Sequence, residues 1–272
     1  MKPQEELQVL KSHIQLTENG ATKRDGLERF VSGLGKYLLL DADSLLYNVA
    51  HFHLDKESDF DIMYEDFLAQ VRAISNRIED DGFIIEDVVY FFTTCSKSFR
   101  KELLPSYKEN RPKNDTTSLV YEIKKYIIKE LINENAPVSL DSELEADDLI
   151  PIWINNTDRD NCIICSIDKD LRQIEGAHFD YYKVKTGDVD EFGYDVKDYR
   201  GWSYTTKQEG YDLFLKQMLI GDNSDNIKGV EGIGKVGANK IVKGSNFEKL
   251  LKVARAYKDM DRMRLNVKLM RL

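Results

Sequence analysis

Acidic side chains in this 272-residue sequence gather where predicted strands end and where predicted helices begin. Carboxylate oxygens without histidine or cysteine among them are the ligands that Mg²⁺ or Mn²⁺ prefers. Several such groups together indicate two ions, and the chemistry that two ions favour is hydrolysis of a phosphodiester bond. The candidate ligands are Asp41, Glu145, Asp147, Asp148, Asp168, Asp170, Asp222 and Asp225.

The elements that carry these acids should bring them together. Asp41 ends the apolar run Tyr37 to Leu40, and parallel strands present their carboxyl ends at one edge of a sheet. Glu145 and Asp148, three residues apart on a predicted helix, share a face. Like charges this close repel one another, so the arrangement requires cations. Any one pair could instead cap a turn or favour a helix dipole, but four groups at element boundaries favour a metal site.

Apolar runs alternate with helical periodicity along the chain. This alternation predicts an α/β fold with a mostly parallel central sheet flanked by helices. Pro105 and Pro112 should separate short helices between the second and third strands. We expect strands at Tyr37–Leu40, Val88–Phe92, Asn161–Ser166 and Phe179–Val184, and helices at Leu45–Phe52 and Phe60–Ile78.

Composition shifts divide the chain into three segments. Residues 1–35 form an accessory arm, residues 36–206 the sheet domain and residues 207–272 a helical region, with a surface excursion at 185–206. The chain has no run of eighteen apolar residues and no secretory signal, and its three cysteines are too few for a disulfide framework. We therefore expect a cytoplasmic protein, monomeric and without a membrane partner.

The charge is unevenly distributed. The formal net charge is −9, but residues 97–129 carry nine Lys or Arg against four acids, and residues 227–272 carry twelve against four. Subtracting these net charges of +5 and +8 leaves −22 for the remainder. Two basic blocks beside an acidic centre suit a protein that holds a polyanion at its edges and cations at its centre. The alternative is that the basic blocks are solvated helix faces.

A glycine-rich segment follows the last acidic pair. Gly232, Gly234 and Gly237 match the spacing of a dinucleotide-binding fingerprint, but a predicted helix rather than a strand precedes them. We interpret residues 227–242 as a hairpin between short helices, with the second helix starting at Lys235. Exposed backbone N–H groups there can hold a phosphate without reading a base, and Lys235 and Lys240 add positive charge.

Several of these stretches together resemble one known family. The segments LLLDAD at 38–43, ELEADDLI at 143–150, SIDKD at 166–170 and GDNSDNIKGVEGIGKVGANKIV at 221–242 follow the order found in the 5′ nucleases related to flap endonucleases, above all their bacteriophage members. The resemblance covers roughly residues 36–245. It implies a PIN-like nuclease domain, a helical arch at about 97–135 that passes a single strand, and a C-terminal helix-three-turn-helix that holds duplex DNA.

The resemblance also implies an activity. Members of the family use two Mg²⁺ ions, for which Mn²⁺ can substitute, and the helix-three-turn-helix often binds K⁺. They act on DNA with 5′ single-stranded flaps or 5′ ends as 5′-3′ exonucleases and flap endonucleases in replication or repair, and some phage members remove RNA primers from RNA–DNA hybrids. The same activity and substrates are the expectation for this chain.

Residue roles carry over by motif. Asp41, Glu145, Asp147 and Asp148 would serve the first metal, and Asp168, Asp170, Asp222 and Asp225 the second. Lys97 and Arg100, expected on one helix face, would steady the scissile phosphate, while Lys108 and Arg111 would guide the strand through the arch. Tyr47 would stack on a base near the cut, although ordinary helix packing explains a tyrosine there equally well.

One departure from the family pattern stands out. Relatives usually end the second strand with an aspartate that supports the first metal, and this chain has Thr93 and Thr94 there. Our hypothesis is that Asp43, or a water held by either threonine, compensates. The departure keeps open a catalytically weak or inactive member that only binds branched DNA, and a third alternative is a ribonuclease that acts on RNA alone.

Overall fold

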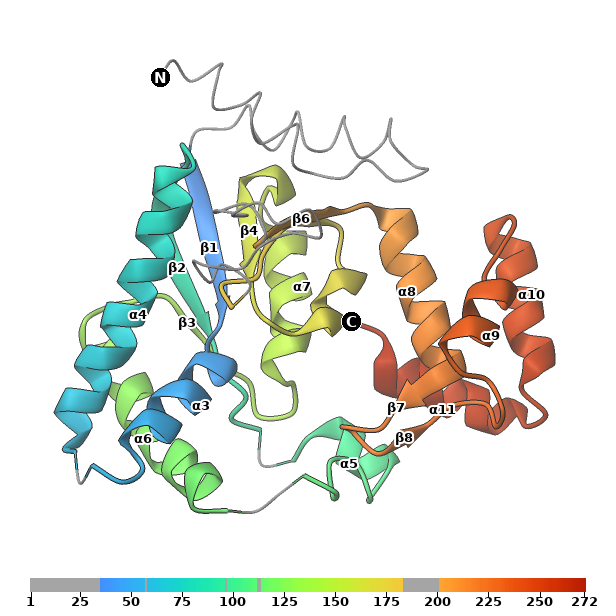
Figure 1. Cartoon of the computed structure of the whole chain (residues 1–272), viewed down its shortest axis with the longest axis horizontal. Coiled ribbons are helices and arrows are strands. Elements are labelled where there is room, and N and C mark those ends of the chain that lie inside the picture. Colours follow the sequence, from blue (N-terminus) through green and yellow to red (C-terminus); the bar gives the residue numbers. More distant parts are fainter. Residues whose placement is uncertain (1–34, 57, 96, 112–113, 183–200) are drawn as a thin grey trace, which may run out of the picture.

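A six-stranded sheet forms the centre of the molecule, in a computed structural model that describes residues 35–56, 58–95, 97–111, 114–182 and 201–272 (Figure 1). The strand order is β3-β2-β1-β4-β5-β6. Neighbouring strands are parallel, except that β6 runs antiparallel to β5. The strands are β1 (Gly35–Asp41), β2 (Ile84–Phe91), β3 (Val138–Ser139), β4 (Cys162–Cys165), β5 (Gly176–Phe179) and β6 (Trp202–Thr205). The predicted α/β class with a mostly parallel sheet is confirmed.

The centre of the sheet is apolar on both faces because helices cover both. Leu38 and Leu40 of β1 belong to one hydrophobic cluster and Leu39 to another, and all three side chains are fully buried. An unbroken apolar run is therefore what this strand requires, since alternate residues enter different cores. The short β4, Cys162 to Cys165, is buried throughout for the same reason.

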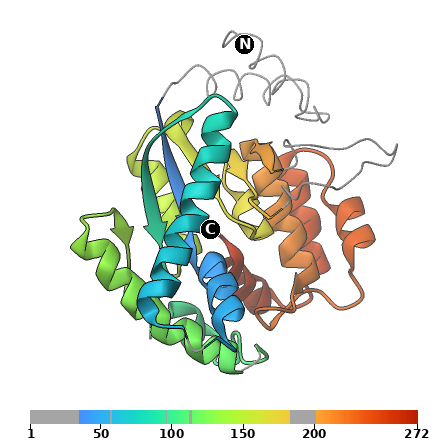
Figure 2. The ribbon, with the colours of Figure 1, turned by 60° about the vertical axis from the view of Figure 1, so that its left-hand side comes forward.

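Three helices cover one face and one helix covers the other. Figure 2 shows α3 (Ala42–His53), α4 (Phe60–Asp80) and α6 (Asp115–Asn133) together on one side of the sheet. Phe67 of α4 and Ile123 and Ile127 of α6 are fully buried in the cluster that they share with β1. The opposite face is covered by α7 (Ala146–Asn156), through Ile150 and Ile154.

The packing of α6 changes the expected extent of the arch. One face of α6 (residues 115–133) packs into the core of the sheet domain through Ile123, Ile127 and Leu131, so this helix is part of that domain and not a free-standing side of an arch. Only α5 (Phe99–Leu103) and the turn residues up to Arg111 cross to the C-terminal helices. Figure 1 shows this connection below the carboxyl ends of the strands. We call residues 99–111 the strap.

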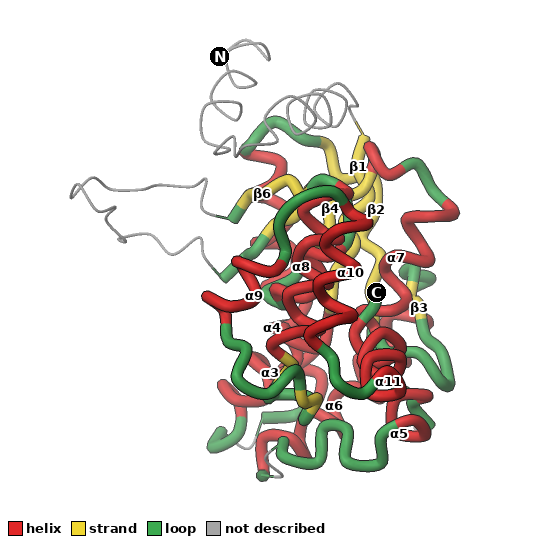
Figure 3. The backbone as a smooth tube through the Cα atoms, turned by 90° about the vertical axis from the view of Figure 1, so that its right-hand side faces the viewer, coloured by secondary structure: helices red, strands yellow, loops and turns green. Residues whose placement is uncertain are grey.

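The C-terminal helices build their own core. Figure 3 shows α8, α9 and α10 in front of the sheet. Buried side chains from α8, α9, α10 and α11 form a separate hydrophobic cluster, which Tyr107 of the strap joins. The elements are α8 (Lys207–Ile220), β7 (Gly221–Asp222), β8 (Ile227–Lys228), α9 (Lys235–Ile241), α10 (Asn246–Ala256) and α11 (Met260–Met270).

A glycine pair allows the tight turn after α8. Gly221 ends the helix with φ of 81°, a left-handed conformation that favours glycine. A Cβ atom on Gly229 would lie 2.3 Å from the carbonyl carbon of Ile220, so the two backbone segments can approach only without side chains. The antiparallel pair β7–β8 covers residues 221–228 and so precedes most of the hairpin predicted at 227–242, whereas α9 begins at Lys235 as predicted.

The far edge of the sheet differs from the sequence-based expectation. The strand expected at Phe179–Val184 is wrong, because β5 instead covers Gly176–Phe179, where it pairs with β4. The aromatic residues that favoured the later position lie after the strand. Residues 202–205, expected in a surface excursion, form the antiparallel strand β6, which is largely buried because Trp202 and Tyr204 pack against the core.

Some expectations lie outside the described residues. The accessory arm except Gly35, residues 185–200 of the expected excursion and residues 183–184 of the expected strand belong to this group. Within the described ranges, no helix has both the length and the apolar character needed to cross a bilayer.

A buried histidine in β5 predicts a pH-dependent stability. Burial lowers the pKa of His178 from 6.5 to about 4, and its Nε2–H donates to the Ile174 carbonyl oxygen at 2.9 Å. As pH falls below 6.5 the unfolded chain takes up the proton first, so the free energy of unfolding should fall, by up to about 3 kcal/mol near pH 4. Buried acids whose pKa values are raised act in the opposite direction, so urea unfolding at several pH values should show this contribution as a difference in slope between the wild type and a variant without the imidazole.

The substitution His178→Gln should remove that contribution, because glutamine keeps a donor and does not titrate. His51→Gln, at an exposed position of α3, is the matched control and should leave the slope unchanged. Identical pH slopes in the wild type and His178→Gln would contradict the prediction.

Candidate active site

Two adjoining hollows lie at the carboxyl ends of the strands. The larger has a volume of about 590 Å³ and the smaller of about 30 Å³, and Asp147 in the first turn of α7 lines both. Most of the predicted acids lie around them. Asp41, Glu145 and Asp168 line the larger hollow together with Asp43, and Asp170, Asp222 and Asp225 line the smaller.

These positions follow from the local structure. Asp41 is the last residue of β1, and Ser166, directly after β4, donates to its Oδ2 at 2.7 Å. Asp168 starts a short helical turn by accepting from the backbone of Asp170 at 2.8 Å. Adjacent parallel strands therefore bring acids 127 residues apart in sequence to one edge, as the topology predicts.

Nearby positive groups only partly offset the negative charge of several of these carboxylates. Burial, with repulsion from neighbouring acids, raises the pKa of Asp41 to about 7 and that of Asp170 to about 7. Burial also raises the pKa of Asp147 to about 7, although Arg100 opposes the rise. Oδ1 of Asp147 is buried and has no hydrogen-bond partner within the described residues. A cation close to these acids would favour their charged forms.

The donor chemistry fits a hard divalent cation, but the acids do not form a closed cage. Within the described ranges, no three carboxylate, imidazole or thiol groups lie close enough to hold one ion. Mg²⁺ commonly binds through one or two carboxylates and keeps several waters. A site made of two of these acids and several water molecules therefore suits such an ion better than a site made of carboxylates alone.

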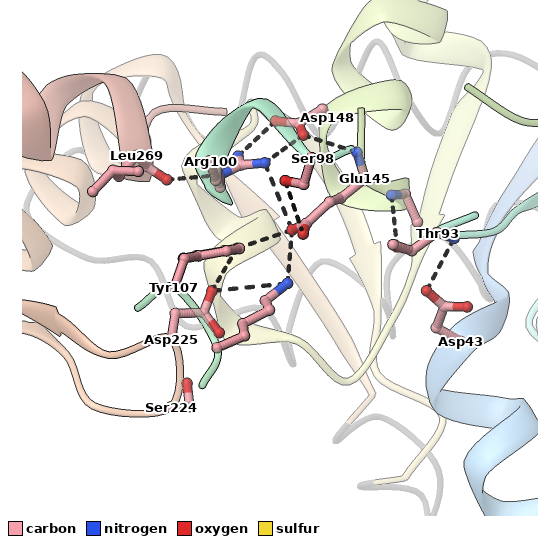
Figure 4. A network of polar contacts seen from close by, with 12 residues as sticks. Asp43, Thr93, Ser98, Arg100, Tyr107, Glu145, Asp148, Ser224, Asp225 and Leu269 are labelled. Atoms are coloured by element: carbon pink, nitrogen blue, oxygen red, sulfur yellow. Dashed lines mark hydrogen bonds and ion pairs between the residues drawn. The ribbon is translucent and has the colours of Figure 1, made fainter. Parts of the chain in front are cut away.

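The side chain of Arg100 is buried inside the protein and does not approach the acids from the solvent side. Its side chain is 2% exposed, and its NH1 and NH2 groups donate to the two carboxylate oxygens of Asp148 at 2.5 and 2.6 Å. Its Nε donates to the backbone oxygen of Leu269 at 2.8 Å, so it joins α7 to α11 (Figure 4). Asp148 is thereby held in an ion pair and is not among the acids that line either hollow.

The expectation that Lys97 and Arg100 share a helix face is wrong. Lys97 is exposed and precedes α5, which begins at Phe99, whereas Arg100 points into the protein. Neither residue lines the larger hollow. The side chains that line it from the strap are Lys101, Lys108 and Arg111.

The strap is held to the acids by its own cations. Lys108 Nζ lies 2.7 Å from Oε2 of Glu145, and Arg111 NH2 lies 2.6 Å from Oδ1 of Asp225. The hydroxyl of Tyr107 lies 2.9 Å from a carboxylate oxygen of each of these two acids (Figure 4). The strap is thus docked on both the sheet domain and the loop between β7 and β8.

The end of the second strand is also fixed by polar contacts. The Thr93 backbone N–H donates to Oδ2 of Asp43 at 3.0 Å, and Lys124 of α6 pairs with Oδ1 of Asp43 at 2.6 Å. The Thr93 hydroxyl accepts from the backbone N–H of Ala146 at 3.0 Å, and Thr94 donates to Asp141. The side chains named in the compensation hypothesis therefore connect β2, α3, α6 and α7, and Asp43 and Thr93 line the larger hollow.

The remaining predicted contact residues lie on the surface. Tyr47 of α3 is 43% exposed and lines the larger hollow. Lys235 and Lys240 of α9 are exposed. No heavy atom lies within 4 Å of where a Cβ would stand at Gly232 or Gly234, whereas at Gly237 it would contact Ile233. The backbone of the glycine turn is therefore open to a bulky group.

Comparison with known proteins identifies the family. Residues 36–199 match the model of the 5′-3′ exonuclease N-terminal resolvase-like domain, and they include the parallel strands of the sheet and most of the acids described above. The chain belongs to this 5′-3′ exonuclease family.

Individual relatives agree with this assignment. The chain is 31% identical over 165 residues to a DNA polymerase I of Borreliella burgdorferi, which covers 58% of this chain and 17% of that protein. It is 28% identical over 216 residues to a 5′-3′ exonuclease of Buchnera aphidicola, covering 76% of this chain and 66% of the relative. The chain thus spans a small part of the first relative and about two thirds of the second.

Solved structures share the fold. The bacteriophage T5 D15 protein co-crystallised with metal ions aligns with a TM-score of 0.57 at 17% identity, over 87% of this chain and 88% of that chain. The T5 D15 flap endonuclease in a pseudo-enzyme-product complex with DNA and metal ions aligns with a TM-score of 0.58 at 17% identity, over the same fractions. Because the sequence identity is only 17%, these two alignments show a shared fold and no more.

The sequence analysis missed several residues at the site. Lys101 and Lys124 line the larger hollow, and Gln173 and Gln217 line the smaller. Lys101 and Lys124 lie within the first basic block, but charge alone does not show which lysines turn inward. The two glutamines give no sequence signal, because a single polar residue on a helix is ordinarily solvated.

The burial of Arg100 predicts a structural role that can be measured. Arg100→Met should lower the free energy of unfolding by about 3–5 kcal/mol, because it leaves the buried Asp148 carboxylate without its ion-pair partner. Lys101→Met, on the adjacent exposed residue, should change it by less than about 0.5 kcal/mol. Urea unfolding followed by circular dichroism measures both. A fully stable Arg100→Met variant would instead favour direct contact of Arg100 with a ligand.

Proposed function

We propose that this protein is a divalent-metal-dependent 5′ nuclease that hydrolyses phosphodiester bonds of DNA. The observation that carries the proposal is the pair of hollows lined by acids and joined at Asp147, with the cations of the strap on one wall. Membership of the 5′-3′ exonuclease family supports the proposed reaction. Acids without an offsetting charge, beside basic groups that can hold a phosphate, suit cleavage of a polyanion better than binding alone.

The acids would divide between two ions as the family resemblance implies. Asp41, Glu145 and Asp147 would serve one ion and Asp168, Asp170, Asp222 and Asp225 the other, at most two of them directly in each group and the rest through bound water. Asp148 would support the first group through the backbone N–H of Glu145, from which it accepts at 3.1 Å. Bound Mg²⁺ or Mn²⁺ would supply an activated water and stabilise charge on the attacking and leaving oxygens. Ser166 orients Asp41 by donating to its Oδ2.

The basic groups would bind the substrate. Lys101, Lys108, Arg111 and Lys124 line the larger hollow and can hold the phosphates of a single strand, and Tyr47 offers an exposed ring on which a base can stack. The open backbone of the glycine turn, with Lys235 and Lys240, would hold the duplex through its phosphates. We include K⁺ at that turn in the proposal on the basis of the resemblance alone.

We propose DNA with 5′ flaps or 5′ ends as the substrate, in replication or repair, with RNA–DNA hybrids as a second substrate and a monomer as the active form. The main competing function is a member that binds branched DNA without cutting it. The absence of an acid at Thr93 favours that alternative, because Thr93 and Asp43 are occupied by other contacts. Cleavage assays decide between them.

Removing the central carboxylates should abolish cleavage without abolishing binding. Asp147→Asn and Asp170→Asn should each lower the rate of cleavage of a 5′-flap DNA by about 100-fold or more in Mg²⁺, since each removes a cation ligand and not a phosphate contact. Asp261→Asn, on the exposed face of α11, is the control and should cleave at the wild-type rate. A wild-type protein that binds the flap but never cuts it in Mg²⁺ or Mn²⁺ would establish the binding-only alternative.

Phosphate contacts at the glycine turn predict a specific salt dependence. The logarithm of the duplex affinity should fall steeply with the logarithm of salt concentration, and Lys235→Gln or Lys240→Gln should each lower that slope by about one. Arg72→Gln, on the exposed surface of α4, should leave the slope unchanged. Fluorescence anisotropy at several salt concentrations measures the slope, and an affinity that is nearly independent of salt would contradict the proposed contacts.

A further inference from the structure

A chain of side-chain amides lies on the wall of the smaller hollow, beside Asp170. Gln217 of α8 donates from Nε2 to Oδ1 of Asp170 at 2.6 Å. Gln173 donates from its own Nε2 to Oε1 of Gln217 at 2.7 Å. Both glutamines and Asp170 line the hollow. The carboxylate is therefore contacted by a neutral donor that is itself held by a second amide.

Backbone groups set the direction of this chain. Gln173 Nε2 also donates to the Met270 backbone oxygen at 2.8 Å, and its Oε1 accepts from the backbone N–H of Leu272 at 3.3 Å. In a side-chain amide the oxygen only accepts and the nitrogen only donates. Because the oxygen of Gln173 faces Leu272, its nitrogen faces Gln217, and the nitrogen of Gln217 must then face Asp170.

The surroundings of Asp170 make an oriented donor important. The acidic neighbours Asp168 and Asp222 repel the charge of Asp170, and the adjacent Lys169 offsets this repulsion only in part. A hydrogen bond from a neutral amide fixes Oδ1 without neutralising the carboxylate. Since a carboxylate is planar, fixing one oxygen restricts the direction of the other. The negative charge stays available to a cation.

We propose that Gln217 and Gln173 are positioning residues that hold the Asp170 carboxylate in the orientation that binds a divalent cation. The inference rests on the proposed function, because it assumes that Asp170 serves such an ion. Outer partners that orient a metal ligand typically change metal affinity 10- to 100-fold when they are removed. Gln217 acts on Asp170 directly, whereas Gln173 acts only through Gln217.

Calorimetric titration of Mn²⁺ alone into the full chain, without nucleic acid, tests the proposal. Gln217→Met and Gln173→Met keep side-chain length and remove the amide, and each should weaken Mn²⁺ binding by roughly tenfold. The double variant should bind no more weakly than Gln217→Met, because the effect of Gln173 passes through Gln217. Gln208→Met is the matched control, since Gln208 lies on the same helix and donates to a different acid, Asp212, at 2.7 Å.

The outcomes separate the inference from the proposed function. Wild-type affinity in Gln217→Met with an unchanged melting temperature overturns the inference, and so do additive losses in the double variant. If Gln217→Met does not fold, Gln173→Met decides alone, because Gln173 does not contact Asp170. Equal Mn²⁺ binding by the wild type and both variants overturns this inference only, whereas a wild type that binds no Mn²⁺ overturns the proposed function as well.

Discussion

Like charges that are taken out of water together must be offset by opposite charges, and this constraint organises the whole edge of the sheet. The protein meets it in part with its own cations, because Arg100 pairs with Asp148 and Lys108 with Glu145. It leaves Asp41, Asp147 and Asp170 without an equivalent partner, and burial raises the pKa of each to about 7. All three of these uncompensated groups line the hollows, which is where an external cation could reach them.

The fold can sustain this concentration of charge because two cores hold it from either side. The parallel sheet fixes Asp41 and Asp168 at the ends of neighbouring strands, and the C-terminal helices fix Asp222 and Asp225 on a short hairpin. Arg100 and Tyr107 connect the two parts, one through the backbone of Leu269 and the other through the C-terminal hydrophobic cluster. The close packing of apolar side chains in these two cores therefore resists the repulsion between the acids.

Local patterns in the sequence predicted the three central strands β2, β1 and β4 but not β3 at one edge or β5 and β6 at the other. The run from Tyr37 to Leu40 is identifiable because a central strand is apolar on both faces, whereas β5 contains glycine and histidine and is defined by its pairing with β4. The family resemblance assigns Arg100 to the scissile phosphate, but the side chain is buried, and only its distant partners Asp148 and Leu269 explain why. The acids were easier to place, since their positions follow from strand order alone.

The strap couples the binding of a divalent cation by the acids to the binding of a phosphate by the strap's own cations. The hydroxyl of Tyr107 lies 2.9 Å from both Glu145 and Asp225, but it can donate its single hydrogen to only one of them at a time. The charges of these two carboxylates are offset by Lys108 and Arg111, which are also the strap cations that a phosphate entering the larger hollow would meet. Under the proposed function, the carboxylates and the substrate compete for these two side chains. A divalent cation beside Glu145 or Asp225 would weaken their hold on the strap and strengthen phosphate binding, and by linkage a bound phosphate would strengthen cation binding to the same degree.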